Sequence, residues 1–287
     1  MNPATRTVTS ADGTAIGYDR TGEGPALVLV DGAFCSRSFG PMPELAPLLA
    51  PNFTVYNYDR RGRGQSGDTQ PYAAEREIDD LEALIDAAGA PVHLFGISSG
   101  AVLAMRATAA LPGKVRSLAV YEPPLLVDRS RPAPPEDYRK QVDDLIAAGR
   151  NGNVVSFFMT KVVAAPAFVP YVLRLTPAWP KLKAVAPTLR YDFAVLGDAF
   201  RGQGLPEEFR KVLGAIDVPT LVADGGKSPA WMHNGVQAVA DAIPHPRRTT
   251  LPGQTHQVKP ALLAPALINF FRAESRHGTE SRDGAES

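Results

Sequence analysis

Disulfide-forming cysteines, signal-peptide features and long apolar runs are absent from the sequence. Cys35 is its single cysteine, so the chain forms no internal disulfide and we expect a reducing compartment. Residues 1–10 contain no apolar signal core. No apolar run approaches the roughly 18 residues that a membrane-spanning helix needs. We therefore expect a cytoplasmic protein with no membrane partner.

An excess of charge of either sign is also absent. Lys and Arg together number 30, as do Asp and Glu, which gives a net charge of zero. This balance argues against nucleic acid or an acidic membrane surface as the main partner. With 44% hydrophobic residues, the chain of 287 residues has enough apolar material for a sizeable core. We expect a monomer or homodimer that acts on a small molecule.

Strand and helix patterns alternate over the first 124 residues. Residues 26–30 form a continuous apolar run, which is typical of a strand buried on both faces. Residues 74–88 have apolar side chains at helical spacing and are followed by Gly89, a common helix stop. This alternation predicts an α/β protein with a parallel sheet and helices on both faces. The expected strands in this part are residues 5–10, 14–18, 26–30, 53–58, 92–95 and 114–121.

The pattern changes after residue 124. Residues 125–215 contain helical runs and no convincing strand, and several prolines divide their middle into short pieces. We interpret this region as a helical cap inserted into a core formed by residues 1–124 and 216–273. Residues 274–287 are polar, contain glycine and lack large apolar side chains, which predicts a disordered tail.

The most informative motif is Gly96-Ile97-Ser98-Ser99-Gly100, a G-x-S-x-G sequence between an apolar strand and a helix-forming run. In this context the turn holds the serine in a strained backbone conformation and lifts its hydroxyl clear of the sheet. We expect the glycines because a Cβ at either position would collide with a neighbouring strand or helix. The N–H groups that begin the next helix would face a developing negative charge. The alternative is a glycine-rich loop in which Ser98 has no function.

Four segments together resemble the α/β-hydrolase superfamily over residues 5–271. They are the turn Asp31-Gly32-Ala33, the glycine-rich loop of residues 58–67, the turn around Ser98 and the sequence Gly253-Gln254-Thr255-His256 before the last helix. The resemblance implies an eight-stranded, mostly parallel sheet with a cap over the carboxyl ends of its strands. In such sheets the active site lies in the crevice at those ends.

The resemblance assigns two catalytic side chains directly. Ser98 would be the nucleophile, and it needs a base at about 2.6–3.2 Å because a free hydroxyl reacts poorly near neutral pH. His256 would be that base, because an imidazole can take up and return a proton near pH 7. Neither a metal nor a cofactor is implied.

The acid of the triad departs from the usual pattern. The superfamily most often carries it just after the strand that follows the cap, where this chain has Ser228. Some members carry it one strand earlier, about two dozen residues after the nucleophile, and that position is Glu122 here. We therefore expect Glu122 to be the acid. The alternatives are that Glu122 is a helix cap or an exposed turn residue, and that the acid is Asp224.

The resemblance also implies an oxyanion hole. It would consist of the backbone N–H groups of Ala33 and Ser99, and loss of one such donor typically costs about 3–4 kcal/mol of transition-state stabilisation. Asp31 stands where related proteins usually carry histidine. We expect it to accept backbone N–H groups in its loop. Alternatively, it places a charge near the site and raises the pKa of the catalytic histidine.

Two further groups of residues are candidates for substrate binding. The arginines of Arg60-Arg61-Gly62-Arg63 either bind substrate or, as we expect, act with Asp59 to brace adjacent loops through hydrogen bonds. Large apolar side chains would line a pocket for an apolar acyl or alcohol group. The candidates for that pocket are Phe34, Phe158, Tyr191 and Trp231.

These features predict a cofactor-free serine hydrolase that cleaves a small, largely apolar ester, lactone or thioester through an acyl-enzyme. A serine at this turn argues against haloalkane dehalogenases and epoxide hydrolases, which use a carboxylate there. Two alternatives stay open. One is hydrolysis of a carbon–carbon bond or another non-esterase reaction on the same triad, and the other is a small-molecule receptor on the same scaffold. Fold and triad do not separate them, because the pocket decides the chemistry.

Overall fold

The core is a single sheet in the computed structural model, which describes the backbone of residues 6–283 and side chains up to residue 275. β1 pairs with β2 and β2 with β4 in antiparallel orientation, and all other neighbouring strands are parallel. The predicted eight-stranded, mostly parallel sheet is confirmed. Across the sheet the strands are β1 (Arg6–Thr9), β2 (Ala15–Thr21), β4 (Thr54–Tyr58), β3 (Ala26–Val30), β5 (Val92–Ile97), β6 (Val115–Tyr121), β7 (Thr220–Gly225) and β8 (Pro246–Leu251).

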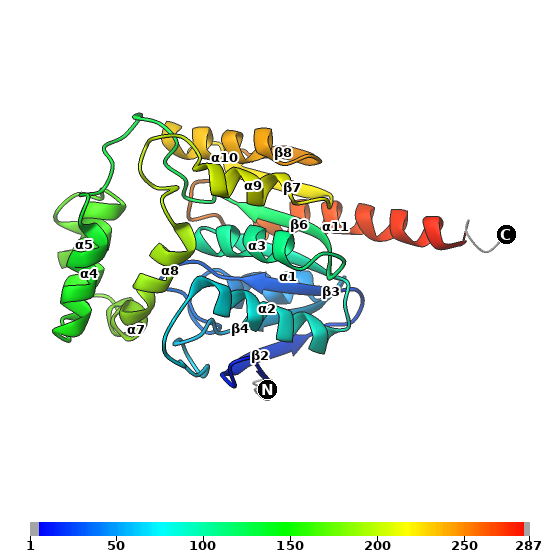
Figure 1. Cartoon of the computed structure of the whole chain (residues 1–287), viewed down its shortest axis with the longest axis horizontal. Coiled ribbons are helices and arrows are strands. Elements are labelled where there is room, and N and C mark those ends of the chain that lie inside the picture. The colour runs from blue at the N-terminus through cyan, green and yellow to red at the C-terminus, as the bar shows by residue number, and fades with distance from the viewer. Residues whose placement is uncertain (1–5, 284–287) are drawn as a thin grey trace.

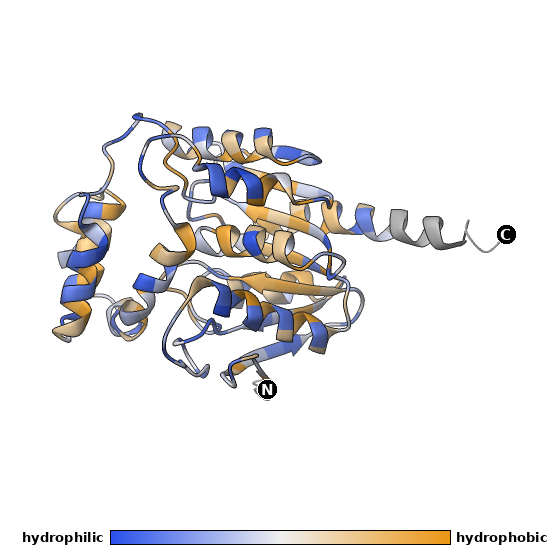
Figure 2. Cartoon of the chain, viewed as in Figure 1, coloured by the Kyte–Doolittle hydropathy of each residue, from blue (hydrophilic) through white to orange (hydrophobic). Residues whose placement is uncertain are grey.

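Helices cover both faces of this sheet (Figure 1). α1 (Met42–Leu49) and α11 (Pro260–Asp283) pack together on one face. α2 (Ala74–Ala88), α3 (Ser99–Ala110) and α10 (Ala230–Ala242) pack on the other. Hydrophobic residues concentrate on the central strands and on the helix surfaces that face them (Figure 2). The arrangement confirms the predicted helices on both faces.

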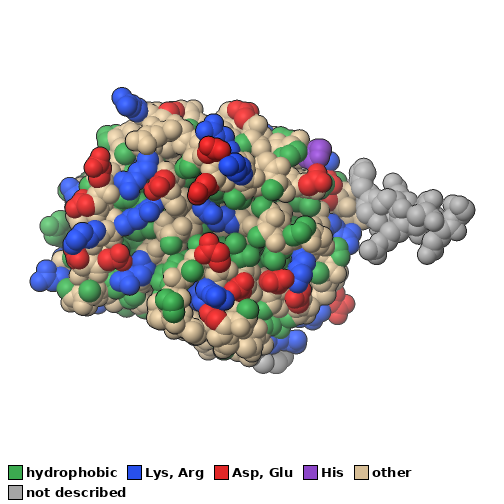
Figure 3. Space-filling view, in the orientation of Figure 1, with side chains coloured by type: hydrophobic (Ala, Val, Ile, Leu, Met, Phe, Trp, Pro, Cys, Tyr) green, Lys and Arg blue, Asp and Glu red, His purple; other side chains and the backbone are tan. Residues whose placement is uncertain are grey.

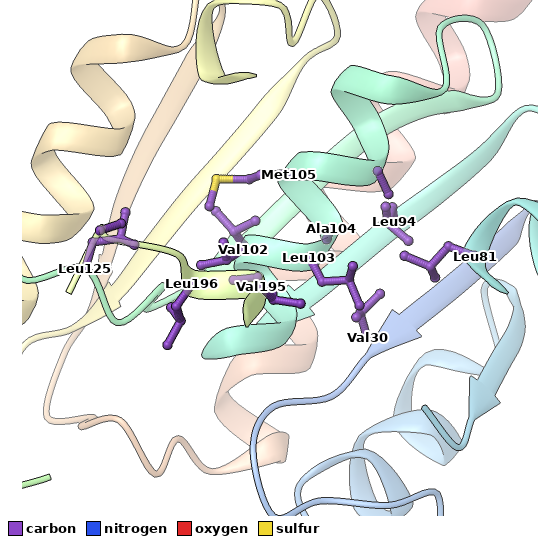
Figure 4. Packing of buried hydrophobic residues seen from close by; sticks show 14 of the residues in the cluster. Val30, Leu81, Leu94, Val102, Leu103, Ala104, Met105, Leu125, Val195 and Leu196 are labelled. Carbon is purple, nitrogen blue, oxygen red and sulfur yellow. The ribbon is translucent and has the colours of Figure 1, made fainter. Parts of the chain in front are cut away.

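The two hydrophobic layers separate because successive residues of a strand point to opposite faces. In β3, Leu27 and Leu29 belong to the cluster that includes α1 and α11, whereas Val28 and Val30 belong to the cluster that includes α3. Figure 4 shows Val30 in this second cluster together with Leu103 of α3. A continuous apolar run therefore contributes to both layers, as expected for a strand buried on both sides.

The segment between β6 and β7 is helical throughout its regular structure, as the sequence predicted. α4, α5 and α7 stand apart from the sheet at the left of Figure 1, whereas α8 packs against α3. α9 falls inside the predicted cap boundaries, yet it packs against α3 and α10 on the face of the sheet. The elements are α4 (Tyr138–Ala147), α5 (Asn151–Phe157), the π-helix η1 (Phe158–Val162), α6 (Val169–Leu173), α7 (Ala178–Val185), the 3₁₀-helix η2 (Ala186–Thr188), α8 (Leu189–Leu196) and α9 (Glu207–Gly214).

The predicted disordered tail does not hold for residues 274–283, because α11 continues to Asp283. Two contacts hold the chain beyond the last large apolar residues. Glu274 forms an ion pair of 2.8 Å with Arg247, and the hydroxyl of Ser275 lies 2.9 Å from Nε2 of the buried His93. The polar composition of this segment therefore did not prevent it from continuing α11, which is held to the sheet by the contacts of Glu274 and Ser275. Residues 284–287 of the predicted tail lie outside the described residues.

The described helices include none that is both long and apolar enough to cross a membrane. On the face of the molecule seen in Figure 3, acidic and basic side chains are interspersed. This distribution agrees with the balanced charge of the sequence.

Candidate active site

Three side chains that are far apart in the sequence meet at the carboxyl ends of the parallel strands. Ser98 follows β5, Glu122 follows β6 and His256 follows β8. The Nδ1 atom of His256 lies 2.9 Å from Oε2 of Glu122, and its Nε2 atom lies 3.2 Å from Oγ of Ser98. The imidazole thus bridges a carboxylate and a hydroxyl, as in a triad of nucleophile, base and acid.

The turn at Ser98 has the strained geometry that the motif predicts. Ser98 has φ 57° and ψ −131° and precedes the first turn of α3, a conformation that is uncommon for a residue with a side chain. A Cβ on Gly96 would lie 2.5 Å from the carbonyl oxygen of Gly100, and a Cβ on Gly100 would lie 2.4 Å from that of Val30. Both glycines are therefore required by close backbone packing, which fixes the turn and the direction of the serine.

Glu122 is buried and held by three partners. Its backbone has φ 46°, and its side chain is 0% exposed. Oε1 accepts hydrogen bonds from the amide of Gly225 at 2.7 Å and from the hydroxyl of Ser228 at 2.5 Å, which leaves Oε2 for His256. Ser228, at the position where the superfamily most often has its acid, thus donates to the carboxylate that faces His256.

Asp224, the alternative acid, faces away from His256. It lies inside β7, and its carboxylate accepts hydrogen bonds from Thr250 and Arg248 of β8 and contacts Nδ1 of His233. The geometry therefore selects Glu122 over Asp224 as the partner of His256. It also rules out the reading of Glu122 as an exposed turn residue.

Asp31 lies buried in the loop that leads to Ala33. Its Oδ1 accepts the backbone N–H of Gly32 at 2.9 Å, as predicted, whereas its Oδ2 has no hydrogen-bond partner among the described residues. Burial raises the pKa of Asp31 to about 7, although the Gly32 amide and the nearby Arg63 act in the opposite direction. The carboxyl group therefore titrates near neutral pH behind the candidate oxyanion loop.

The arginine loop braces its neighbours, as we expected, and its guanidinium groups are buried. Arg60 donates both Nε and Nη2 to Glu77, each at 2.7 Å. Arg63 donates to the carbonyl oxygen of Gly32 at 2.6 Å. Arg61 is likewise paired with Asp80 at 2.7 Å. These contacts are internal to the protein, so the alternative of a substrate-binding arginine patch is wrong.

Asp192 of α8 joins this arginine cluster to the site and was not identified from the sequence. Its carboxylate accepts from Arg60 at 2.6 Å, from Arg63 at 2.7 Å and from the hydroxyl of Ser99 at 2.7 Å. Burial alone would raise the pKa of Asp192, but the charges of Arg63 and Arg60 outweigh it and hold the pKa below its ordinary value. Nothing in the local sequence around Tyr191-Asp192-Phe193 signals this role, because the partners come from distant loops.

A cavity of about 250 Å³ opens beside the Ser98 hydroxyl. Phe158 and Trp231 line it, as predicted, and so do Ala33 and Ser99 of the candidate oxyanion hole. Most of the remaining lining is apolar and comes from η1, α8 and the start of α10. Further lining residues are Pro124, Arg131, Val162, Phe193, Leu196, Phe200, Met232 and His256.

Two predicted substrate-binding residues do not line this cavity. The ring of Tyr191 stacks on that of Tyr72 at 3.7 Å, and its hydroxyl donates to Asp68 at 2.8 Å, so its side chain is committed to the loop before α2. Phe34 packs edge-on against the ring of Phe158 at 5.0 Å and supports the lining from behind. Sequence spacing identified both as large and apolar but could not give their direction.

Comparison with known proteins agrees with this geometry. A model of the alpha/beta hydrolase family matches residues 27–269. An alpha/beta hydrolase from Sphaerobacter thermophilus DSM 20745 has a crystal structure that superposes with a TM-score of 0.85 at 49% identity, over 93% of this chain and 100% of that chain.

Two curated bacterial proteins are similar over shorter segments. The uncharacterized hydrolase YraK of Bacillus subtilis (strain 168) is 33% identical over 118 residues, which is 40% of this chain and 43% of YraK. Lipase LipV of Mycobacterium tuberculosis (strain ATCC 25618 / H37Rv) is 32% identical over 132 residues, which is 44% of this chain and 45% of LipV. The matches thus span less than half the length of either relative. The family match over most of the chain, the sheet order and the turn at Ser98 together show that this chain belongs to the alpha/beta hydrolase family.

Proposed function

We propose that the protein is a cofactor-free serine hydrolase that cleaves a small ester, lactone or thioester. The observation that carries the proposal is the continuous line of contacts from Glu122 through His256 to Ser98, 2.9 Å and 3.2 Å long, at the wall of the cavity. Similarity to a lipase over part of the chain supports the same class of reaction.

The proposed reaction begins when Oγ of Ser98 attacks the carbonyl carbon of the substrate and its proton passes to Nε2 of His256. Glu122 holds the imidazole by its Nδ1–H and offsets the positive charge that forms. The N–H groups of Ala33 and Ser99 stabilise the oxyanion of the tetrahedral intermediate. The carbon–oxygen or carbon–sulfur bond to the leaving group then breaks, and His256 returns the proton to that group.

Deacylation repeats these steps with water. His256 takes a proton from a water molecule that attacks the acyl-enzyme, and the second tetrahedral intermediate collapses to the free acid and Ser98. In this scheme the helices between β6 and β7 form the predicted cap. Residues of η1 and α8 that line the cavity, such as Phe158 and Leu196, would cover the bound substrate and exclude bulk water.

Hydrolysis of a series of 4-nitrophenyl esters of increasing acyl length tests the proposal. We expect turnover for short acyl groups, with kcat/KM falling once the acyl chain exceeds the cavity. The Ser98→Ala variant removes the proposed nucleophile without adding bulk, and we expect it to lose turnover while keeping the melting temperature of the wild type. Ester hydrolysis that survives unchanged in Ser98→Ala would contradict the proposal.

A further inference from the structure

Arg131 is the one cavity-lining cation whose charge the described residues do not neutralise. It lies in the loop between β6 and α4 and lines the cavity beside Ser98 and His256. Its guanidinium carbon lies 4.9 Å from the ring centre of Trp231 and 5.4 Å from that of Phe200. Aromatic faces attract a cation but accept no in-plane N–H hydrogen bond.

The hydrogen bonds of Arg131 leave part of its guanidinium group without an acceptor. Nη2 donates to the carbonyl oxygen of Val162 at 2.6 Å, and Nε donates to that of Pro132 at 3.2 Å. Within residues 6–275, Nη1 has no hydrogen-bond acceptor and no carboxylate lies within ion-pair distance of the group. Burial lowers the pKa of Arg131, and no carboxylate opposes this effect. The cation is therefore partly desolvated and lacks an anionic partner.

Each of the other ionisable side chains that line the cavity, among the described residues, has a partner of this kind. Asp192 lines the cavity, but Arg60 and Arg63 pair with it. Glu77 pairs with Arg60 from the other side, so that these two arginines face two carboxylates. His256 faces Glu122. The fold thus neutralises the buried arginines that brace its loops and leaves uncompensated the one that faces the cavity.

We propose that Arg131 binds an anionic group of the substrate, so that the preferred substrates carry a carboxylate on the part that occupies the cavity. The guanidinium fork matches a carboxylate in shape and charge and forms strong hydrogen bonds with it. The inference rests on the proposed hydrolase function and narrows its substrate class to short, half-apolar molecules with one free carboxylate. The cavity of about 250 Å³ is smaller than the roughly 300–1,000 Å³ of typical drug-sized sites.

Paired esters of the same diacid test this preference. The charged member is the mono-4-nitrophenyl ester of adipic acid, and the neutral member is methyl 4-nitrophenyl adipate, with the pimelate and suberate pairs covering a longer reach. Release of 4-nitrophenol is measured against the Ser98→Ala variant, which gives the background of spontaneous hydrolysis. For at least one chain length we expect the wild type to show a kcat/KM about 10- to 100-fold higher on the charged member, as for a hydrogen bond to a charged group.

Three variants separate charge recognition from a structural role of Arg131. Arg131→Gln should remove the preference, so that kcat/KM falls by a larger factor on the charged ester than on the neutral one, while Arg131→Lys should retain part of the preference. Arg174→Gln is the matched control, because Arg174 also lies over two rings, those of Tyr171 and Trp179 at 5.3 and 5.4 Å, yet does not line the cavity. It should keep the full preference.

Two results would overturn the assignment. One is a wild type that shows no preference for the charged ester at any chain length, a result that does not depend on how any variant folds. The other is an Arg131→Gln variant with the melting temperature of the wild type in which both esters slow equally.

Binding to Ser98→Ala distinguishes failure of this inference from failure of the proposed function. Isothermal titration with monomethyl adipate and with dimethyl adipate needs no turnover. We expect tighter binding of the monoanion, lost when Arg131→Gln is added. Binding without such a preference, in a protein whose wild type hydrolyses the neutral esters, overturns only the role of Arg131. If Ser98→Ala binds the monoanion more tightly but the wild type hydrolyses neither ester, the proposed function is overturned instead.

Discussion

Two carboxylate–histidine pairs lie at the ends of neighbouring strands, and only one of them adjoins the cavity. At the end of β6, Glu122 lies 2.9 Å from Nδ1 of His256. In β7, Asp224 lies 2.8 Å from Nδ1 of His233. Both carboxylates are 0% exposed. Burial and a histidine partner therefore do not by themselves identify the catalytic carboxylate.

The two pairs differ in what lies beyond the imidazole and around the carboxylate. Nε2 of His256 faces the hydroxyl of Ser98 on its strained turn. His233 contacts no hydroxyl group among the described residues. The carboxylate of its partner, Asp224, also accepts hydrogen bonds from Thr250 and Arg248. The second pair ties α10 and β8 to β7. The comparison shows that the strained serine, and the cavity beside it, turn a common structural pair into a candidate relay of protons.

The largest expected difference between the two pairs comes from isosteric amide substitutions. Glu122→Gln should lower kcat for ester hydrolysis by about 10⁴-fold, as loss of the triad carboxylate does in serine proteases. Asp224→Asn, the matched control, should keep a kcat close to wild type per folded molecule and lower the melting temperature, because Arg248 loses its carboxylate partner. Steady-state kinetics after titration of active sites measures kcat for both variants, and thermal denaturation measures the melting temperature. A near-wild-type Glu122→Gln with an inactive Asp224→Asn would reverse our assignment of the two pairs.

Asp192 extends the comparison to a buried carboxylate that touches the site without a histidine. Asp192→Asn should lower the free energy of unfolding by about 3–5 kcal/mol, because two buried guanidinium groups lose a shared anion. Displacement of the loops that Arg63 holds should also reduce kcat by up to about 100-fold. Urea denaturation and kinetics on the same ester measure the two effects.

The control for Asp192 is Ser99→Ala, which removes only the hydroxyl that donates to this carboxylate and leaves the Ser99 amide in place. It should cost about 1 kcal/mol of stability and little activity. If Ser99→Ala lowered kcat as much as Asp192→Asn, the arginines would not be the route by which Asp192 supports the site.

The last expected effect concerns stability alone and involves Asp31, a buried carboxyl that has neither a histidine nor an ion-pair partner among the described residues. Because burial raises its pKa to about 7, between about pH 4 and 7 the folded state holds a proton that the unfolded state has lost. The free energy of unfolding should therefore fall with rising pH in this window, by at most about 1.4 kcal/mol per pH unit. In Asp31→Asn this contribution disappears.

His93 makes the free energy of unfolding change with pH in the opposite direction. The quantity to compare is therefore the difference in this free energy between Asp31→Asn and the wild type, in which the contribution of His93 cancels. Burial lowers the pKa of His93 to about 4, so that the unfolded state binds the extra proton and stability rises from about pH 4 to 6.5. Urea denaturation at pH 4.5 and pH 7 should show that Asp31→Asn gains stability relative to the wild type as the pH rises. A difference that stays constant across these pH values would contradict the raised pKa.

The sequence was sufficient to predict the sheet and the proximity of Ser98, Glu122 and His256, because both depend on local patterns in a known chain order. The apolar runs of the strands predicted the layers, and the G-x-S-x-G motif predicted the strained turn at Ser98. His256 and Glu122 followed from the resemblance, which supplied their places after the last strand and at the end of β6. Only the structure explains why a serine occupies position 228, because there its hydroxyl donates to Glu122.

The cavity could not be predicted in the same way, because its lining comes from a proline-interrupted region. The direction of Tyr191 depends on its stacking with Tyr72, which lies more than a hundred residues earlier in the chain. The surroundings of Arg131 and Asp192 also come from distant parts of the chain: Arg131 lies over two aromatic rings, and Asp192 pairs with two arginines. Such long-range partners leave no periodic signal in the sequence.

Covalent labelling by a fluorophosphonate, followed by intact mass and peptide mapping, tests most directly whether His256 rather than His233 activates Ser98. We predict one label per molecule on Ser98 in the wild type and in His233→Ala, and no labelling in His256→Ala or Ser98→Ala at the same exposure. Labelling that persists in His256→Ala, or that disappears in a folded His233→Ala, would contradict the account.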